Sequence, residues 1–511
     1  MQLTEEQKYI VEFPDNLIIR ACAGAGKTST FINKAKAFPN KKILYLCFNK
    51  SIQLEAQHKF PNNTTCKTVH ALAYHAIVTG GKYKLSNYGY STFDIKNLLE
   101  IPDGLDYHGF KIAHLVKTKM NIFMNSDKND IDDIDLEMYM TSTDSLFLFR
   151  EYKRAINILS KKFWNMMDSK KIDITHDFYV KKYSFLDKDL GFDYIFVDEA
   201  QDVSPCFIRI INAQKRAKKF VCGDFSQAIY GWRFGVGDFA KYFPDSAPAK
   251  LSNSFRFRPD IANLCNLIIN LKKELLDFKD DLEVIGVGEN NNLLSKASIS
   301  RTNSGVLDAV LSYNNIVSSL YIEGGLSSIM QYDGFSLNDI MSLFFKNKSF
   351  IKSKFIQSFE SYSDLKTYSD SVEAQDLKSA MRIVENYNTN LIDLLKEIKN
   401  KSVEVKKDAD IVFSTVHKSK GLEYNIVSLT PDFITENELR ARMDQENLDE
   451  NFHKTNIPHL MEEVNLLYVA VSRTQNKLDM PSGLVNKPLE SILNKSIGDA
   501  MTNYLISGAS F

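Results

Sequence analysis

Phe196-Val197-Asp198-Glu199-Ala200-Gln201-Asp202 is the stretch that decides the fold class of this chain. The apolar run 194–197 predicts a buried strand, and the carboxylates of Asp198 and Glu199 follow at its carboxyl end. In open α/β sheets, ligands bind beside the carboxyl ends of the strands. Far upstream, another apolar run, Leu17 to Arg20, precedes the glycine-rich segment 21–28. The two segments together predict an α/β fold with parallel sheets and a phosphate-binding site.

The segment Ala21-Cys22-Ala23-Gly24-Ala25-Gly26-Lys27-Thr28 has the composition of a phosphate-binding loop. Its glycines let backbone N–H groups face phosphates, the Lys27 amine reaches the β- and γ-phosphates, and the Thr28 hydroxyl binds Mg²⁺. The full pattern begins with a glycine, and Ala21 stands in that place. The alternative interpretation is a glycine-rich turn before a helix, which the acidic strand disfavours. We therefore expect a nucleotide and Mg²⁺ at this loop.

Hydrolysis of a γ-phosphate needs an oriented water molecule and positive charge on the transition state. We expect Asp198 to hold Mg²⁺ and Glu199 to polarise the attacking water; the alternative is an acidic strand end that caps a helix. Candidates for the positive charge are Arg256, in Asn253-Ser254-Phe255-Arg256, and Arg473, in the segment 468–474. Each lies next to an apolar or aromatic run that could fix it, although either alone is typical of a surface arginine.

The composition excludes several classes of protein. The chain has 511 residues, 44% of them hydrophobic, and a formal net charge of -1. Nucleic-acid binding would therefore depend on local lysines, arginines and exposed aromatic residues. The six cysteines are scattered without metal-ligand spacing, which predicts reduced thiols in a cytoplasmic protein. The polar amino terminus predicts that there is no signal peptide. The sequence has no run of about 18 apolar residues, so no membrane span is expected.

Strand and helix signals alternate in two regions, and a helical segment interrupts each of them. The expected boundaries are 1–88 and 189–250 for the first α/β domain, 89–188 for its insertion, 251–306 and 404–511 for the second α/β domain with a C-terminal tail, and 307–403 for its insertion. Within the second insertion, helical patterns run from Ile316 to Ile322 and from Leu337 to Phe345.

Several motifs in a fixed order give the chain a family resemblance. It resembles the superfamily 1 DNA helicases of the UvrD/Rep/PcrA type from Leu3 to about Leu478. Within them it is most similar to the F-box DNA helicase branch, although the F-box itself is missing. The branch is indicated by Phe48-Asn49-Lys50-Ser51-Ile52, Lys67-Thr68-Val69-His70-Ala71-Leu72-Ala73-Tyr74 and Ser254-Phe255-Arg256-Phe257. The resemblance implies two RecA-like P-loop domains that hydrolyse ATP between them, each interrupted by a mainly helical insertion.

The resemblance implies a role for each motif in the nucleotide site. Gln7 would read the adenine, Phe255 would stack on it, and Glu423 would bind the ribose. Gln227 would sense the γ-phosphate, and Arg256 and Arg473 would be arginine fingers. The implied ATP-binding set is Gln7, Gly24, Ala25, Gly26, Lys27, Thr28, Ser29, Phe255 and Glu423, with Thr28 and Asp198 for Mg²⁺; the implied catalytic set is Lys27, Asp198, Glu199, Gln227, Arg256 and Arg473.

A further set of residues would hold single-stranded DNA. By resemblance the set comprises Phe48, Asn49, Thr68, His70, Tyr230, Trp232, Asn303 and His417. Aromatic faces suit this task, because each stacked base contributes about 1–3 kcal/mol. Tyr230 and Trp232 alternate in the segment 229–233, and the alternative interpretation is that both belong to a core.

Departures from the family pattern bear on function. Arg233-Phe234-Gly235 stands where the family usually has Arg-Gly-Ala, so this loop is expected to be reshaped. The strand after Arg473 is expected to end early, at Met480-Pro481. The second insertion is much shorter than in UvrD-type relatives, where it contacts duplex DNA, which puts strand separation in doubt more than ATP hydrolysis.

These residues favour an ATP-driven motor that moves 3′-to-5′ on single-stranded DNA or on tailed or forked duplexes. The alternative is a DNA-stimulated ATPase switch that remodels or recruits partners without separating strands. An RNA helicase is a third interpretation, which no sequence feature excludes. The sequence leaves open the pathway (repair, replication restart, plasmid or phage maintenance, or anti-phage defence). It also leaves open a nuclease or regulatory partner on another chain.

Overall fold

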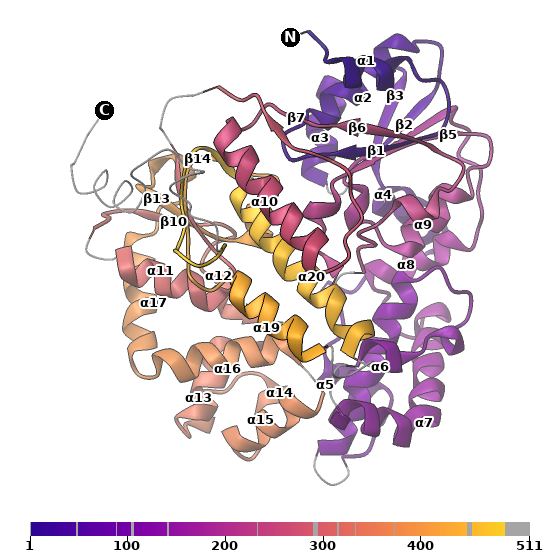
Figure 1. Cartoon of the computed structure of the whole chain (residues 1–511). Helices are drawn as coiled ribbons and strands as arrows, with labels where there is room; N and C mark the ends of the chain where they lie inside the picture. The colour runs from indigo at the N-terminus through magenta and orange to yellow at the C-terminus, as the bar shows by residue number, and fades with distance from the viewer. Residues whose placement is uncertain are drawn as a thin grey trace.

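The computed structural model describes residues 2–47, 50–87, 89–103, 107–140, 143–231, 234–289, 295–313, 316–332, 334–372, 374–446 and 452–485. Two parallel sheets, each with helices packed around it, form separate parts of the molecule (Figure 1). The predicted α/β class is therefore confirmed. Among the described residues, no helix has both the length and the apolar character needed to cross a membrane.

The first sheet has six parallel strands in the order β3-β2-β4-β5-β1-β6. The strands are β1 (Leu17–Ala21), β2 (Ile43–Cys47), β3 (Thr64–Thr68), β4 (Tyr194–Val197), β5 (Lys218–Gly223) and β6 (Ala247–Leu251). Only β5 separates β1 from β4, so the carboxyl ends of these two strands lie at the same edge of the sheet. The glycine-rich loop and the acidic pair that follow them are thereby brought together.

The apolar sequence of β4 follows from its burial on both faces. Ile195 and Val197 belong to the core that α9 (Pro205–Asn212) shares, whereas Phe196 stacks on Phe31 of α2 (Lys27–Ala37) with ring centroids 4.8 Å apart. Parallel strands covered on both faces read as continuous apolar runs rather than alternating ones. The other helices next to this sheet are α1 (Glu5–Glu12), α3 (Lys50–Lys59), α4 (Val69–Ala73) and the π-helix η1 (Tyr74–Thr79).

The second sheet has five parallel strands in the order β10-β13-β9-β14-β15. They are β9 (Lys296–Ser300), β10 (Leu320–Ile322), β13 (Ile411–Thr415), β14 (Tyr424–Leu429) and β15 (Thr474–Asp479). The short pair β7 (Asn253–Ser254) and β8 (Ile285–Gly286) lies between the two sheets in sequence. Around the sheet are α10 (Pro259–Leu275), α11 (Asn303–Tyr313), α18 (Val416–Ser419), α19 (Glu436–Glu446) and α20 (Phe452–Val471).

Strand β10 corrects one sequence expectation. The run Ile316 to Ile322 is predicted to be helical, but Leu320–Ile322 pairs with β13 instead. The pattern of seven apolar and polar residues is compatible with a short buried strand and with a turn of helix. The strand that decides between them, β13, lies about ninety residues further along the chain. Strand β15 ends at Asp479, in agreement with the expected early end.

The two insertions are mainly helical. The first contains α5 (Thr92–Leu98), α6 (His108–Asn125), α7 (Thr143–Asp168) and α8 (His176–Ser184). The second contains α12 (Ser327–Met330), the hairpin β11 (Gln331–Tyr332) and β12 (Phe335–Ser336), α13 (Leu337–Phe344), α14 (Lys354–Gln357), α15 (Tyr362–Ser371), α16 (Gln375–Tyr387) and α17 (Asn390–Lys401). Figure 1 shows α5 and α6 next to α14 and α15, so the insertions touch one another.

An aromatic seam joins the insertions, which we define as Tyr107 and Phe110 of the first with Phe355 and Phe359 of the second. The Tyr107 and Phe359 ring centroids lie 4.7 Å apart, and those of Phe110 and Phe355 lie 5.5 Å apart. The backbone N–H of Glu360 also donates to the Tyr107 hydroxyl at 3.2 Å. Phe359 is fully buried. The seam is an apolar junction between the two halves of the molecule, away from the sheets.

Candidate nucleotide site and nucleic-acid track

The glycine-rich loop between β1 and α2 is shaped by left-handed glycines. Gly24 and Gly26 have φ angles of +75° and +74°, a conformation that costs other residues free energy. A Cβ atom on Gly24 would lie 2.6 Å from the Cβ of Arg256, so the loop touches the segment that leads into the second domain. The Phe255 N–H donates to the Gly24 carbonyl at 3.0 Å, which fixes that approach.

Two contacts join the loop to the acidic end of β4. The Lys27 Nζ lies 2.8 Å from the Glu199 Oε1, and the Thr28 hydroxyl donates to the Asp198 Oδ2 at 3.1 Å. The hydroxyl of Tyr45, on β2, donates to the same Asp198 oxygen at 2.7 Å. The predicted groups for phosphate, metal and water therefore meet at one point. Tyr45 was not expected, because nothing in the sequence of β2 marks it.

Charges in this cluster shift one another's protonation. Burial, and then the Glu199 carboxylate, raise the pKa of Asp198 above its usual value. Burial acts in the same direction on Glu199, but the Lys27 and Lys420 ammonium groups and the hydrogen bonds from Lys27 and Gln201 together outweigh it and lower the pKa of Glu199 to about 2. Glu199 is therefore ionised at neutral pH and paired with Lys27. Its φ of +53° is also left-handed, a conformation that costs a residue other than glycine free energy.

The residues expected to bind the adenine, Gln7 and Phe255, lie beside Gly26. The Gln7 Nε2 and the Phe255 Cε2 would lie 3.2 Å and 3.8 Å from a Cβ on Gly26. Gln7 is fixed by the capping box of α1, in which Thr4 and Gln7 exchange hydrogen bonds. The Ser29 hydroxyl donates to the Gly26 carbonyl at 2.8 Å. The structure thus brings Gln7, Phe255 and the loop together, as the resemblance implies.

Both candidate arginines come from the second domain side, and the Arg473 side chain reaches a residue of the first domain. The Arg473 guanidinium is buried and donates to the Gln227 Oε1 at 3.2 Å. Burial, and the nearby Arg256, lower the pKa of Arg473 to about 9, so it stays charged at neutral pH. Arg256 donates to the Glu423 carboxylate at 2.8 Å and to the Ser472 carbonyl at 3.1 Å. Glu423, the implied ribose ligand, is thus an arginine partner here.

A buried ion pair between the domains was missed by the sequence analysis. The Lys420 Nζ contacts the Asp202 carboxylate at 2.6 Å and 2.8 Å and the Gln227 carbonyl at 2.6 Å. Gln201, the residue before Asp202, links two further acidic residues. Its Nε2 donates to Glu199 at 2.7 Å, and its Oε1 accepts from the Asp224 N–H at 3.0 Å. Asp202 lies in the segment 196–202 that decides the fold, and Lys420 lies in the motif that also contains His417 and Glu423. Their positions in these motifs were the signal by which the ion pair could have been found.

The predicted nucleic-acid residues are only partly brought together. Tyr230 and His417 meet across the domains: the Tyr230 hydroxyl donates to the His417 carbonyl at 3.2 Å, and the His417 Nε2 lies 3.2 Å from the Ile229 carbonyl. Burial, and then Arg301, lower the pKa of His417 to about 4.

The remaining predicted track residues lie elsewhere or outside the described part. Thr68 caps α4 by accepting from the Ala71 N–H at 3.1 Å, His70 is exposed on α4, and Asn303 begins α11 in the second domain. Phe48, Asn49 and Trp232 lie outside the described residues. Phe234 has a φ of +65°, so it adopts the turn conformation that the family's usual glycine would adopt without cost.

The oxygen donors present fit Mg²⁺. This ion prefers oxygen ligands and is commonly held by one or two protein groups together with substrate phosphates. The Thr28 hydroxyl and the Asp198 carboxylate lie side by side and supply such a pair. No cluster of three or more histidine, cysteine or acidic side chains suited to a metal occurs in the part of the chain that the structure describes.

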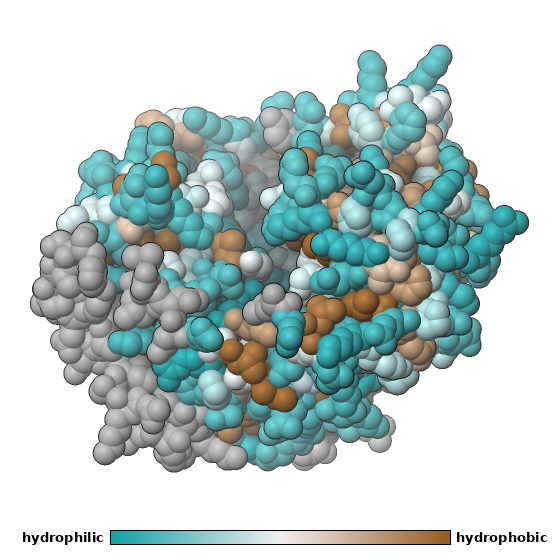
Figure 2. Space-filling view, turned by 90° about the horizontal axis from the view of Figure 1, so that it is seen from above, coloured by the Kyte–Doolittle hydropathy of each residue, from teal (hydrophilic) through white to brown (hydrophobic). Residues whose placement is uncertain are grey.

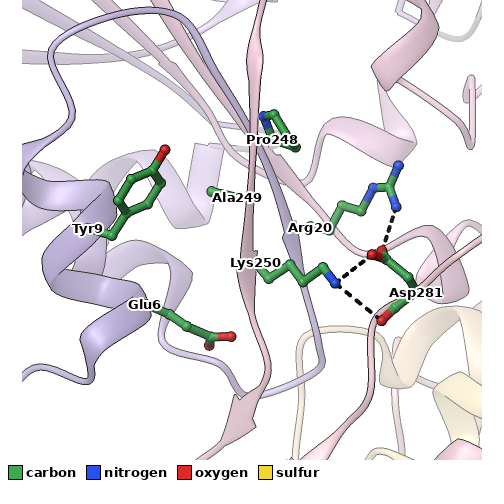
Figure 3. A pocket seen from close by; sticks show the side chains of 7 residues that line it. All are labelled: Glu6, Tyr9, Arg20, Pro248, Ala249, Lys250 and Asp281. Carbon is green, nitrogen blue, oxygen red and sulfur yellow. Dashed lines mark hydrogen bonds and ion pairs between the residues drawn. The ribbon is translucent and has the colours of Figure 1, made fainter.

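A pocket at the outer edge of the first sheet is separate from this site. Figure 3 shows it between α1 and the edge strand β6, where Lys250 and Arg20 both reach Asp281. Glu6, also in its lining, accepts from the N–H and hydroxyl of Ser252 at 2.7 Å and 2.8 Å. Arg20 and Lys250 are thus paired with Asp281, Glu6 is held by Ser252, and none of the predicted nucleotide ligands is among the lining residues.

Comparison with known proteins agrees with this geometry. Residues 3–247 match the UvrD/REP helicase N-terminal domain, and residues 327–482 match the UvrD-like helicase C-terminal domain. The two matches fall on the first and second halves of the architecture and together span more than half of the chain. The chain belongs to the UvrD/REP helicase family. Membership of this family implies ATP as the nucleotide at the glycine-rich loop.

Three relatives of this UvrD/REP protein illustrate the similarity. It is 29% identical to the F-box DNA helicase 1 of Gallus gallus over 95% of this chain and 49% of that protein. It is 29% identical to the F-box DNA helicase protein 1 of Schizosaccharomyces pombe over 93% of this chain and 57% of that protein. The ATP-dependent DNA helicase PcrA of Leuconostoc citreum is 34% identical over 17% of this chain and 13% of that protein. The chain thus spans about half the length of the first two relatives.

Proposed function

We propose that this UvrD/REP protein is an ATP-driven motor that moves 3′-to-5′ on single-stranded DNA. The observation that carries the proposal is the contact between Arg473 and Gln227, because it joins a buried guanidinium of the second domain to the nucleotide-sensing residue of the first. The Lys27–Glu199 and Thr28–Asp198 contacts complete the arrangement on the first domain. The relatives' names, DNA helicases, support DNA as the polymer.

The chemistry we assign is attack of water on the γ-phosphate of ATP. Glu199 accepts the proton of that water, the new P–O bond forms, and the bond to the ADP oxygen breaks. Lys27 leaves Glu199 and binds the β- and γ-phosphates, while Arg256 and Arg473 stabilise the negative charge of the transition state. Thr28 and Asp198 would hold Mg²⁺, which would neutralise charge on the phosphates. Gln7 and Phe255 bind the adenine.

The step that moves DNA uses contacts between the domains. Gln227, Lys420 and Asp202 lie in one network beside the nucleotide site, and Tyr230 and His417 lie next to it. When ATP binds, closure of the two domains shifts Tyr230 relative to His417, and hydrolysis reverses the shift. Thr68, His70 and Asn303, together with Phe48, Asn49 and Trp232, are the other residues we assign to the DNA track.

A DNA-stimulated ATPase switch is the second candidate. The aromatic seam favours it, because a short second insertion that packs on the first is not free to contact duplex DNA.

We propose the domain boundaries that the sequence predicts, except that the second insertion begins after β10. The six cysteines are all free and buried, which supports a reducing compartment such as the cytoplasm.

The first experiment is ATP hydrolysis with and without single-stranded DNA. We expect strong stimulation by DNA in the wild type and loss of hydrolysis by at least about a hundredfold in Lys27→Ala, since the transition state loses its phosphate-binding charge. Lys59→Ala, at an exposed helix position, is the matched control and should hydrolyse normally. A Lys27→Ala protein that still turns over ATP would exclude the assignment of the site.

Strand separation and polymer choice are measured separately. A duplex with a 3′ single-stranded tail should be unwound and one with a 5′ tail should not; hydrolysis without strand release on either duplex would favour the switch. RNA in place of DNA should stimulate hydrolysis weakly. Stimulation by RNA that exceeds stimulation by DNA would replace the DNA motor with an RNA one.

A further inference from the structure

A shelf of aromatic rings that includes His70 lies at the junction of the first domain and its insertion. We define the aromatic shelf as His70, Tyr74, His176 and Tyr179. His70 and Tyr74 stand four residues apart along the helical backbone that begins with α4, which places them on one face. Helix α8 lies beside α4 (Figure 1) and packs against α4 and η1. Its residues His176 and Tyr179 complete the shelf.

Tyr179 is the fixed centre of the shelf. It is 2% exposed, and the rings of Tyr74 and His70 stand at 88° and 89° to it, with centroids 5.8 Å and 6.0 Å away. The His176 Nδ1 lies 3.1 Å from the Tyr179 hydroxyl, and the two rings are 5.7 Å apart. Edge-to-face contacts of this kind restrain ring orientation. Tyr179 therefore holds three outer rings in place before any ligand binds, which lowers the entropy cost of binding.

The outer rings face solvent. Tyr74 is 43% exposed, and His70 and His176 are exposed as well. Tyr74 is also the first residue of the π-helix η1 (Tyr74–Thr79). Helical turns of this type are rare and are found frequently at functional sites. An oriented set of exposed rings next to a predicted DNA-contacting residue is arranged for ligand contact rather than for core packing.

We propose that the aromatic shelf is a base-stacking site for single-stranded DNA that extends the track from His70 onto the first insertion. The proposal rests on the proposed motor function, because His70 belongs to the assigned track. Tyr74 and His176 stack on unpaired bases, and Tyr179 is a positioning residue beneath them. Stacking of bases on aromatic side chains tolerates every base, so this site adds affinity without sequence preference.

The test is binding of a fluorescent single-stranded oligonucleotide to the full chain at several salt concentrations. Tyr74→Ala should raise the Kd about 5- to 150-fold, the range expected for one lost stacking contact. The slope of log Kd against log salt should stay unchanged, because no phosphate contact is removed. Tyr74→Phe should bind as the wild type does. The matched control is Tyr139→Ala, at a tyrosine 54% exposed on η4 (Leu136–Tyr139), which should leave the Kd unchanged.

Separate outcomes test the shelf and the motor. If the wild type binds DNA and Tyr74→Ala binds it equally well, the shelf proposal is wrong and the motor proposal stands. A reduced salt slope in Tyr74→Ala would also overturn stacking, in favour of a phosphate contact. If the wild type does not bind single-stranded DNA, both proposals fail. DNA-free ATP hydrolysis should be unchanged in Tyr74→Ala; if that variant does not fold, His176→Ala, at an exposed position, should show the same loss of DNA affinity.

Discussion

At the scale of single residues, Lys27 and Glu199 each have two partners that they cannot contact at the same time. They form an ion pair at 2.8 Å, although the proposed mechanism needs Lys27 on the phosphates and Glu199 on water. ATP must therefore break this pair before it can be hydrolysed. The pair keeps the carboxylate ionised and oriented, and it also competes with the nucleotide for Lys27.

Replacing Glu199 by glutamine separates these two effects. Glu199→Gln should bind ATP several-fold more tightly, because Lys27 no longer has a carboxylate to leave. Hydrolysis should fall about 10²- to 10⁴-fold, because the amide cannot accept the proton of water. Binding of a fluorescent ATP analogue and single-turnover hydrolysis measure the two effects. Glu55→Gln, which breaks an exposed ion pair with Lys59, is the control and should change neither. Weaker ATP binding in Glu199→Gln would contradict the competition.

The same pair predicts a pH dependence of stability. The pKa of Glu199 is lowered to about 2 in the folded chain, against about 4.3 for a free glutamate. A carboxylate whose pKa is lower in the folded chain stabilises the folded state at pH values above its unfolded pKa. This contribution is lost as the pH falls from the unfolded pKa through the folded pKa. The Tm difference between wild type and Glu199→Gln should be constant from pH 8 to 6. Below about pH 5 the wild type should lose stability relative to the variant; a relative gain would show that the pair is not ionised.

At the scale of elements, the glycine-rich loop is tied to the segment that enters the second domain. Gly24→Ala would place a Cβ 2.6 Å from the Arg256 Cβ and 2.8 Å from the Ser254 Oγ, at a φ of +75°. We expect a loss of about 1–2 kcal/mol from the left-handed backbone and about 1–3 kcal/mol from the overlap. Urea unfolding measures the total, and ATP affinity should fall with it.

Gly191→Ala separates the two contributions. Gly191 has a φ of +71°, and nothing lies within 4 Å of the added Cβ. This control should show the backbone cost alone and bind ATP normally. Equal losses in Gly191→Ala and Gly24→Ala would mean that the loop is not packed tightly against Ser254 and Arg256.

The elements that the sequence predicts best are those whose signal is local. Strand β4 is recovered over 194–197, and the glycine-rich loop follows β1 and leads directly into α2, which begins at Lys27. Both have apolar runs or glycines whose meaning does not depend on distant residues. The strand at Leu320–Ile322 was missed because only its partner β13 makes it a strand.

The contacts that sequence could not supply join distant segments. Tyr45 reaches Asp198 from a neighbouring strand, and Lys420 reaches Asp202 from the other domain. No spacing in a single sequence encodes either meeting. At Phe234, a phenylalanine adopts a left-handed backbone conformation that glycine adopts without cost, and the reshaping of the loop stays a prediction. Here a local rule would have placed glycine, and the tertiary structure overrides it.

At the scale of the whole molecule, two of the junctions between the halves have opposite character. Beside the nucleotide site the contacts are polar, such as Lys420 with Asp202 and Arg473 with Gln227. Polar contacts can be exchanged for contacts with phosphates as the domains close. The aromatic seam between the insertions is apolar. Opening it exposes its rings to water, which costs free energy. Figure 2 shows a hollow between the two lobes of the molecule. We therefore expect domain closure to pivot on the seam rather than to separate it.

A double-mutant cycle across the seam tests this arrangement. The rings of Tyr107 and Phe359 are 4.7 Å apart and belong to different halves, so Tyr107→Ala and Phe359→Ala should each destabilise the chain. Phe359→Ala alone should cost about 3–5 kcal/mol, because the residue is fully buried. Their coupling in urea unfolding should be about 0.5–1.5 kcal/mol, the value expected for an aromatic pair.

The control cycle pairs Tyr107→Ala with Phe350→Ala, a residue of the second insertion that is 68% exposed. These two changes should be additive within about 0.5 kcal/mol. The coupling of Tyr107 to Phe359 should also persist with a non-hydrolysable ATP analogue bound, since the seam stays closed when the domains close. Coupling that disappears in the presence of the analogue would show that the insertions separate during the cycle, and the pivot would then have to lie at the polar contacts between the sheets.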